Sequence, residues 1–147
     1  MRGYFTSDKT LIFPKAKFIL YVEDTLIAYL KLALYYKEKI NPVTIAITGS
    51  SGKTTTKEMM ASVMSKGYKI HKSPLNHNNE VGLCQTLLSM PADTEVLILE
   101  MGMRGLGEIE LLSQYSKPDI AVIANTGTAH IGRLGSVKNI ALSLIHI

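Results

Sequence analysis

The stretch VTIAITGSSGKTTT at residues 43–56 decides the fold of this chain. Its first five residues, Val43–Ile47, are apolar and mostly β-branched, which predicts a buried strand. Gly49 and Gly52 then permit a tight turn in which backbone N–H groups converge on an anion. Residues 57–66 have a helical pattern, and the N-terminus of a helix offers unpaired N–H groups and a positive dipole end. Strand, glycine loop, lysine, hydroxyl and helix together predict a cradle for a nucleotide triphosphate with magnesium.

The glycine loop is shorter than the general phosphate-binding pattern G-x-x-x-x-G-K-[ST], because Ile47 stands where the first glycine would be. The alternative is a turn that merely starts a helix, but the strand before it and the helix after it favour phosphate binding. We expect Lys53 to neutralise the β- and γ-phosphates of ATP and the Thr54 hydroxyl to coordinate Mg²⁺. The loop residues predicted to bind the cofactor are Gly49, Ser50, Ser51, Gly52, Lys53, Thr54 and Thr55.

The composition fits one soluble globular domain with a modest core. The chain has 147 residues, of which 46% are hydrophobic and 19% charged. Its net charge of +4 is scattered, so the sequence does not indicate nucleic-acid binding and suits an anionic nucleotide and substrate equally well. The single cysteine, Cys84, excludes an internal disulfide, fits a reducing compartment and lies on an apolar face typical of a core residue. The sequence has no apolar run of transmembrane length and no signal-peptide layout, so we expect a cytoplasmic protein.

The periodicity predicts strands that alternate with helices. Strands are expected at residues 18–22, 43–47, 68–71, 94–99 and 119–124, and helices at 25–39, 57–66, 80–90 and 108–115. This alternation favours an α/β fold with a mostly parallel sheet, right-handed crossovers and flanking helices. Asn41-Pro42 ends the first helix, and we place a domain junction there. Residues 1–14 have no clear period.

Polar groups that could bind a ligand follow the three most apolar predicted strands, at 43–47, 94–99 and 119–124. In open α/β sheets the ligand lies beyond the carboxyl ends of the strands, where this chain has the glycine loop, Glu100 and Asn125. A carboxylate in that place is the usual partner of a phosphate loop and predicts a Mg²⁺ ligand, although an ordinary strand-edge residue is the alternative. His130 is harder to assign, because a lone histidine is more often structural and imidazole is not a first choice for magnesium.

The loop at residues 74–80 is dense in amides. Asn76, Asn78 and Asn79 offer paired donors and acceptors that would orient a polar substrate. Asparagine also favours turns and helix caps. The sequence leaves both interpretations open.

Four segments carry a family resemblance. They are IAITGSSGKTT at 45–55, NHNNEVG at 76–82, EMGMRGLGEI at 100–109 and PDIAVI at 118–123, with Asn125, Gly127, Ala129, His130, Gly135 and Ser136. On these residues the chain resembles the Mur ligases, ATP-dependent enzymes that build the peptide of bacterial peptidoglycan. The second and third segments are particular to the branch that joins D-alanyl-D-alanine to a UDP-N-acetylmuramoyl tripeptide. The resemblance covers residues 43 to about 141.

The resemblance implies a mechanism and a set of site residues. The terminal carboxylate of the tripeptide attacks the γ-phosphate of ATP, and the amine of D-alanyl-D-alanine then displaces phosphate from the acyl phosphate. Lys53, Glu100 and His130 would be catalytic, with Thr54 and Glu100 on one Mg²⁺ and His130 on a second. Asn125 would bind the nucleotide, while Asn76, Asn78 and Asn79 would face the UDP-sugar peptide. The implied partners include no nucleic acid or membrane, and the full-length enzyme would be a monomer.

The chain also departs from the family pattern. Residues 1–40 resemble only the tail of the UDP-sugar-binding domain, residues 41–141 resemble the first half of the central ATP-binding domain, and no third domain follows. The family's carbamylated lysine has no counterpart after Lys138. Residues 142–147, LSLIHI, match what a sequencing-library transposon end would encode, so we predict a non-native tail and a fragment that does not turn over. The alternatives are another member of the superfamily, such as a folylpolyglutamate synthase, and a non-catalytic nucleotide-binding fragment.

Overall fold

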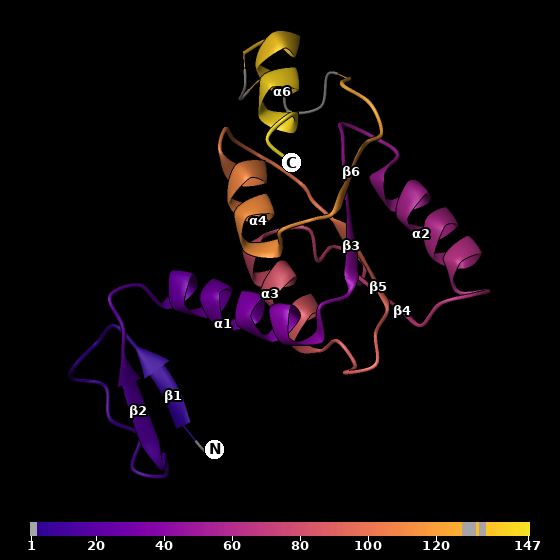
Figure 1. Ribbon diagram of the computed structural model, residues 1–147. Coiled ribbons are helices and arrows are strands. Elements are labelled where there is room, and N and C mark those ends of the chain that lie inside the picture. Colours follow the sequence, from indigo (N-terminus) through magenta and orange to yellow (C-terminus); the bar gives the residue numbers. More distant parts are fainter. Residues whose placement is uncertain (1–2, 128–131, 133–134) are drawn as a thin grey trace.

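The computed structural model describes residues 3–127, 132 and 135–147, and it contains two parallel sheets (Figure 1). The smaller sheet pairs β1 (Gly3–Thr6) with β2 (Phe18–Tyr21). The larger sheet has the order β4 (Ile70–Lys72), β5 (Val96–Glu100), β3 (Val43–Thr48) and β6 (Ile120–Ile123). The helices are α1 (Thr25–Ile40), α2 (Lys53–Met64), α3 (Glu80–Leu88), α4 (Glu108–Ser116) and α6 (Val137–Leu144).

The larger sheet confirms the predicted α/β architecture with parallel strands. β3 pairs with β5 on one side and with β6 on the other, both in parallel. Ile47 lies opposite Glu100, and Thr48 lies opposite Ile123. Because parallel strands end at one edge of a sheet, this register brings the glycine loop, Glu100 and the residues after β6 together.

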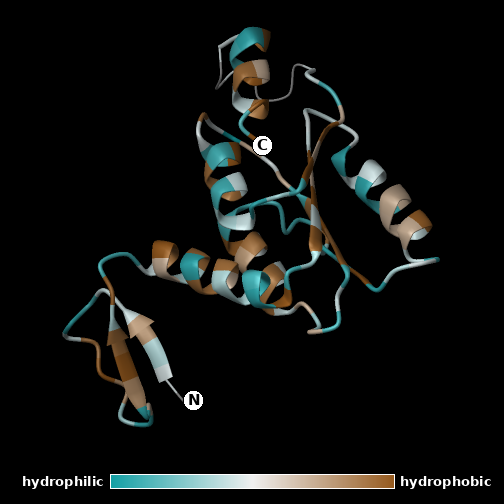
Figure 2. Cartoon of the chain, in the orientation of Figure 1, coloured by the Kyte–Doolittle hydropathy of each residue, from teal (hydrophilic) through white to brown (hydrophobic). Residues whose placement is uncertain are grey.

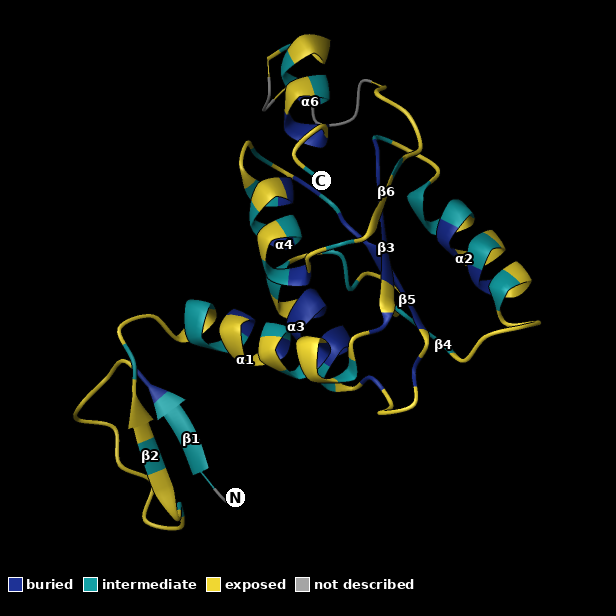
Figure 3. Ribbon diagram, viewed as in Figure 1, coloured by how far each residue is buried: buried dark blue, intermediate teal, exposed yellow. Residues whose placement is uncertain are grey.

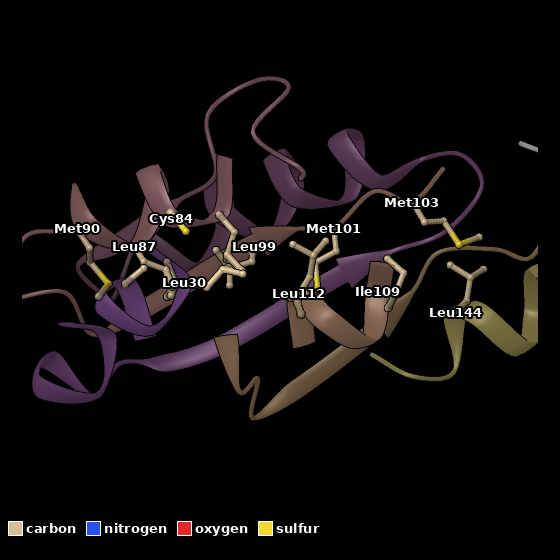
Figure 4. Packing of buried hydrophobic residues seen from close by; sticks show 14 of the residues in the cluster. Leu30, Cys84, Leu87, Met90, Leu99, Met101, Met103, Ile109, Leu112 and Leu144 are labelled. Carbon is tan, nitrogen blue, oxygen red and sulfur yellow. The ribbon is translucent and has the colours of Figure 1, made fainter. Parts of the chain in front are cut away.

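Helices cover both faces of the larger sheet. Helix α2 packs on one face, and α1, α3 and α4 lie on the other (Figure 1). Side chains alternate along a strand, so Ile45 and Ile98 face α2, whereas Ala46 and Leu99 join the larger cluster (Figure 4). β3 and β5 are therefore apolar on both faces and almost wholly buried (Figure 3).

Cys84 belongs to the larger cluster with no exposed surface, which confirms its prediction as a core residue (Figure 4). Leu30 and Ala33 of α1 and Leu144 of α6 join the same cluster, although they lie on the far sides of the predicted boundaries at residues 40 and 141. Those boundaries stay predictions. In contrast, β2 is apolar yet exposed, with Phe18 55% and Leu20 56% accessible (Figures 2 and 3). Within the described ranges, no helix combines the length and hydrophobicity needed to cross a membrane.

The ends of α1 follow the sequence signals. Asp24 accepts a hydrogen bond from the Ile27 N–H and caps the N-terminus, and Asn41 adopts a left-handed conformation (φ 54°) at the C-terminus. The helix ends just before Asn41-Pro42, which confirms the predicted end.

Some predicted element boundaries were wrong. Helix α2 begins at Lys53 rather than residue 57, because Gly52 at φ 80° turns the chain directly into the helix. β4 lies at residues 70–72 rather than 68–71, and α3 ends at Leu88. β1 and α6 have no counterpart in the predicted elements.

Candidate phosphate-binding site

The glycine loop joins the end of β3 to the start of α2 and approaches the chain after β6 closely. A Cβ atom on Gly49 would lie 3.0 Å from the backbone N and O atoms of Asn125, and Gly49 has φ 142°. A side chain at this position would therefore be both strained and crowded. Thr48, at the end of β3, donates a hydrogen bond from Oγ1 to the Met101 carbonyl (2.9 Å), which ties the loop to the end of β5.

Asn125 holds the loop from the neighbouring strand end. Its backbone carbonyl accepts from the Ser50 N–H (3.1 Å), and its Oδ1 accepts from the Ser51 N–H (3.1 Å). Its Nδ2 donates to the Ser51 carbonyl (3.1 Å) and to Ser51 Oγ (2.8 Å). The amide of Asn125, predicted to bind the nucleotide, is thus engaged with the loop in this structure.

The N-terminus of α2 is open for an anion. Gly52 is the N-cap and provides no side-chain cap, while the first intrahelical bond runs from the Thr56 N–H to the Gly52 carbonyl. The amides of residues 53–55 therefore have no acceptor within the helix. Lys53 folds back over the loop, where its Nζ donates to the Gly49 carbonyl (2.7 Å). Free amides, the helix dipole and a lysine together favour the phosphates of a nucleotide.

Glu100 meets the first turn of α2. Side chains alternate along β5, so Glu100 points to the same face as Ile98, the face that α2 covers. Thr54 Oγ1 donates to Glu100 Oε2 at 2.9 Å, and Asn78 Nδ2 lies 3.5 Å from Oε1. Glu100 is 7% exposed. A hydroxyl and a carboxylate are hard oxygen ligands, so this pair fits a Mg²⁺ ion beside bound phosphates.

The amide-rich loop and the turn after β5 enclose a pocket of about 410 Å³ that adjoins Lys53. The residues that line it are Lys53, Asn76, Asn78, Asn79, Glu80, Gly102, Met103, Arg104 and Glu108. The two interpretations of the amide loop are compatible. Asn79 caps α3 by accepting from the Gly82 N–H (2.9 Å), and it also faces the pocket. Asn76 forms the turn with φ 64°.

The structure brings together the predicted loop residues, Glu100 and Asn125, with the three asparagines beside them. His130 lies outside the described residues, and its place on a second metal stays a prediction. Two residues absent from the predicted site are Lys57, buried against Glu100, and Arg104, on the pocket wall. Lys57 follows Thr54 by three positions and lies on the same face of α2, but the predicted helix began only at residue 57, so the helical repeat did not link the two.

Comparison with known proteins identifies the family of the chain. Residues 47–147 match the Mur ligase middle domain. The chain is 45% identical over 134 residues to the UDP-N-acetylmuramoyl-tripeptide--D-alanyl-D-alanine ligase of Bacillus subtilis, covering 91% of this chain and 29% of the relative. It is 49% identical over 120 residues to the Synechocystis ligase of the same name, covering 82% of this chain and 26% of that relative. It therefore spans less than a third of the length of these curated relatives.

Solved structures agree with the sequence comparison. The MurF ligase of Thermotoga maritima in complex with ADP superposes with a TM-score of 0.89 at 32% identity, over 97% of this chain and 33% of that chain. MurF from Acinetobacter baumannii gives a TM-score of 0.85 at 37% identity, over 88% of this chain and 29% of that one. Because the domain match, the sequence identity and the shared fold agree, this chain belongs to the Mur ligase family.

Proposed function

We propose that this chain binds Mg²⁺–ATP at the glycine loop, as the phosphate-binding part of a ligase that adds D-alanyl-D-alanine to a UDP-N-acetylmuramoyl tripeptide. The observation that carries the proposal is the 2.9 Å contact between Thr54 Oγ1 and Glu100 Oε2 beside the uncapped N-terminus of α2. The relatives named for this reaction and the structural neighbour solved with ADP support it.

When bound, Mg²⁺–ATP would supply an activated γ-phosphoryl group for transfer to the tripeptide carboxylate, with ADP as the leaving group. The chain itself contributes placement and charge. The amides of residues 53–55 would donate to phosphate oxygens. The Lys53 ammonium group would give up its hydrogen bond to the Gly49 carbonyl and donate to the phosphates instead. Thr54 and Glu100 would hold the ion. The N–H groups of Ser50 and Ser51 keep their hydrogen bonds to the carbonyl and the Oδ1 of Asn125, which fixes the shape of the cradle.

The pocket beside Lys53 is where we place the tripeptide carboxylate. Arg104 brings a positive charge to its wall, and Asn76, Asn78 and Asn79 supply amide donors and acceptors. A carboxylate held there would lie next to the phosphate-binding loop, as attack on a γ-phosphate requires. The structure thus supports a substrate role for the amide loop in addition to its role in capping α3.

The test is ADP binding measured by isothermal titration calorimetry on the 147-residue chain and its Lys53→Met variant. Losing charged hydrogen bonds to phosphate should weaken binding about tenfold or more. Lys66→Met, which removes the same charge from an exposed residue beyond the far end of α2, should bind as the unmodified chain does. Equal affinities for the chain and the Lys53 variant would contradict the proposed site.

A further inference from the structure

Lys57 is a buried polar side chain on α2 that the proposed chemistry leaves unused. It lies one helical turn after Thr54 and is only 1% exposed. Its Nζ donates to the Ser73 carbonyl (2.9 Å) and lies 3.3 Å from Glu100 Oε2. Glu58 Oε1 is farther away, at 3.6 Å, and Glu58 is half-exposed and already paired with Lys72. Glu100 is therefore the principal carboxylate partner of this buried ammonium group.

The two carboxylate oxygens of Glu100 have different partners. Oε2 receives both the Thr54 hydroxyl and the Lys57 ammonium group, whereas Oε1 lies 3.5 Å from Nδ2 of Asn78, a residue that lines the pocket. Ser73 ties the same arrangement to the sheet, because its Oγ accepts from the Glu100 N–H (3.1 Å) while its carbonyl accepts from Lys57. Oε2 is thus held by two close partners, whereas the contact of Oε1 with Asn78 is at the upper limit of hydrogen-bond length.

We propose that Lys57 is a positioning residue that anchors Glu100 through Oε2, so that Oε1 is presented to the magnesium ion of the nucleotide. The inference rests on the proposed function. Groups behind a metal ligand orient it, and removing them typically costs about ten- to a hundredfold in metal affinity. The ammonium group also compensates the buried carboxylate while the ion is absent, which keeps Glu100 in place before the nucleotide arrives.

Lys37 supplies a matched control for this proposal. It is also a buried lysine, 6% exposed, and its Nζ donates to a backbone carbonyl, that of Lys117 (3.1 Å). It lies on α1, on the opposite face of the sheet from α2. A Lys37→Met variant therefore reproduces the loss of a buried ammonium group far from Glu100.

The experiment measures how much Mg²⁺ strengthens ADP binding. The magnesium gain is the dissociation constant of ADP in EDTA divided by that in excess MgCl₂. Lys57→Met should leave ADP binding in EDTA unchanged, because the loop and Lys53 are intact, and should reduce the magnesium gain about ten- to a hundredfold. Lys37→Met should change neither quantity. Lys57→Arg provides a second variant that keeps the buried charge. Its planar fork would engage both carboxylate oxygens and occupy Oε1, so it too should reduce the gain.

The outcomes separate the inference from the function on which it rests. If the unmodified chain shows no magnesium gain, the proposed function fails and the inference fails with it. If the chain shows the gain and both Lys57 variants retain it, only the inference is overturned. If Lys57→Met weakens ADP binding equally in EDTA and in MgCl₂, Lys57 has a purely structural role and the inference is overturned. A larger magnesium gain in Lys57→Met would show that the ammonium group opposes the ion, and it would overturn the proposal as well.

Discussion

Replacing Asn125 by alanine should weaken ADP binding without unfolding the chain. The side chain makes three hydrogen bonds to Ser51, to its N–H, its carbonyl and its Oγ, at 3.1, 3.1 and 2.8 Å. Each is exposed, so we take the low end of the usual range and assign the three together about 1–2 kcal/mol. If that free energy is what keeps the loop in its binding conformation, its loss lowers the apparent affinity about fivefold to thirtyfold.

Calorimetric titration with ADP in excess MgCl₂ measures this loss, and urea unfolding checks that the fold is retained. The variant keeps the backbone bond from the Ser50 N–H to the carbonyl of residue 125, so the loop should loosen rather than detach. Gln114→Ala, which removes an exposed amide from α4, should bind ADP normally. Unchanged binding by Asn125→Ala would refute the loop-holding role. A loss far beyond the stated range would instead indicate direct contact with the nucleotide.

Three further predictions address stability. Glu100→Gln should lower the free energy of unfolding by about 3 kcal/mol, because the Lys57 ammonium group stays buried without its carboxylate; a urea midpoint equal to that of the unmodified chain would contradict this. Leu112→Ala should cost about 3 kcal/mol in the same assay, whereas Leu106→Ala, at a 65% exposed position, should cost less than about 0.5 kcal/mol. Burial raises the pKa of the Cys84 thiol from 9.0 to about 11, so the unfolded thiol ionises first. Stability should therefore be lost as pH rises from 9 to about 11, and pH-dependent urea unfolding should show a smaller decline for Cys84→Ala.

The sequence was sufficient for the elements that have strong local signals. The apolar β-branched runs of β3 and β5 and the capped, proline-terminated α1 were predicted nearly to the residue. The start of α2 was predicted four residues late, because a helix that begins at a glycine has no side-chain cap to announce it. β1 was missed because its sequence, GYFT, has no clear period, and its pairing with β2 is a nonlocal contact.

The candidate site was also predicted only in part from the sequence. Lys53 and Thr54 were picked out by the glycine loop and Glu100 by its strand end, and their proximity was predicted because parallel strands bring their carboxyl ends to one edge. The loop-holding contacts of Asn125 and the place of Arg104 on the pocket wall were not. Each depends on how close two separate segments approach, which no local pattern records.

By itself, the amino-acid sequence determined most of the alternating strands and helices and the glycine loop between β3 and α2. Those properties follow from backbone preferences and side-chain periodicity over a few neighbouring residues. Only the tertiary structure decided that Glu100 shares Oε2 between Thr54 and Lys57 while Oε1 lies beside Asn78. That division depends on the packing of α2 against β5, and the distance between a helix face and a strand end is set by the whole core.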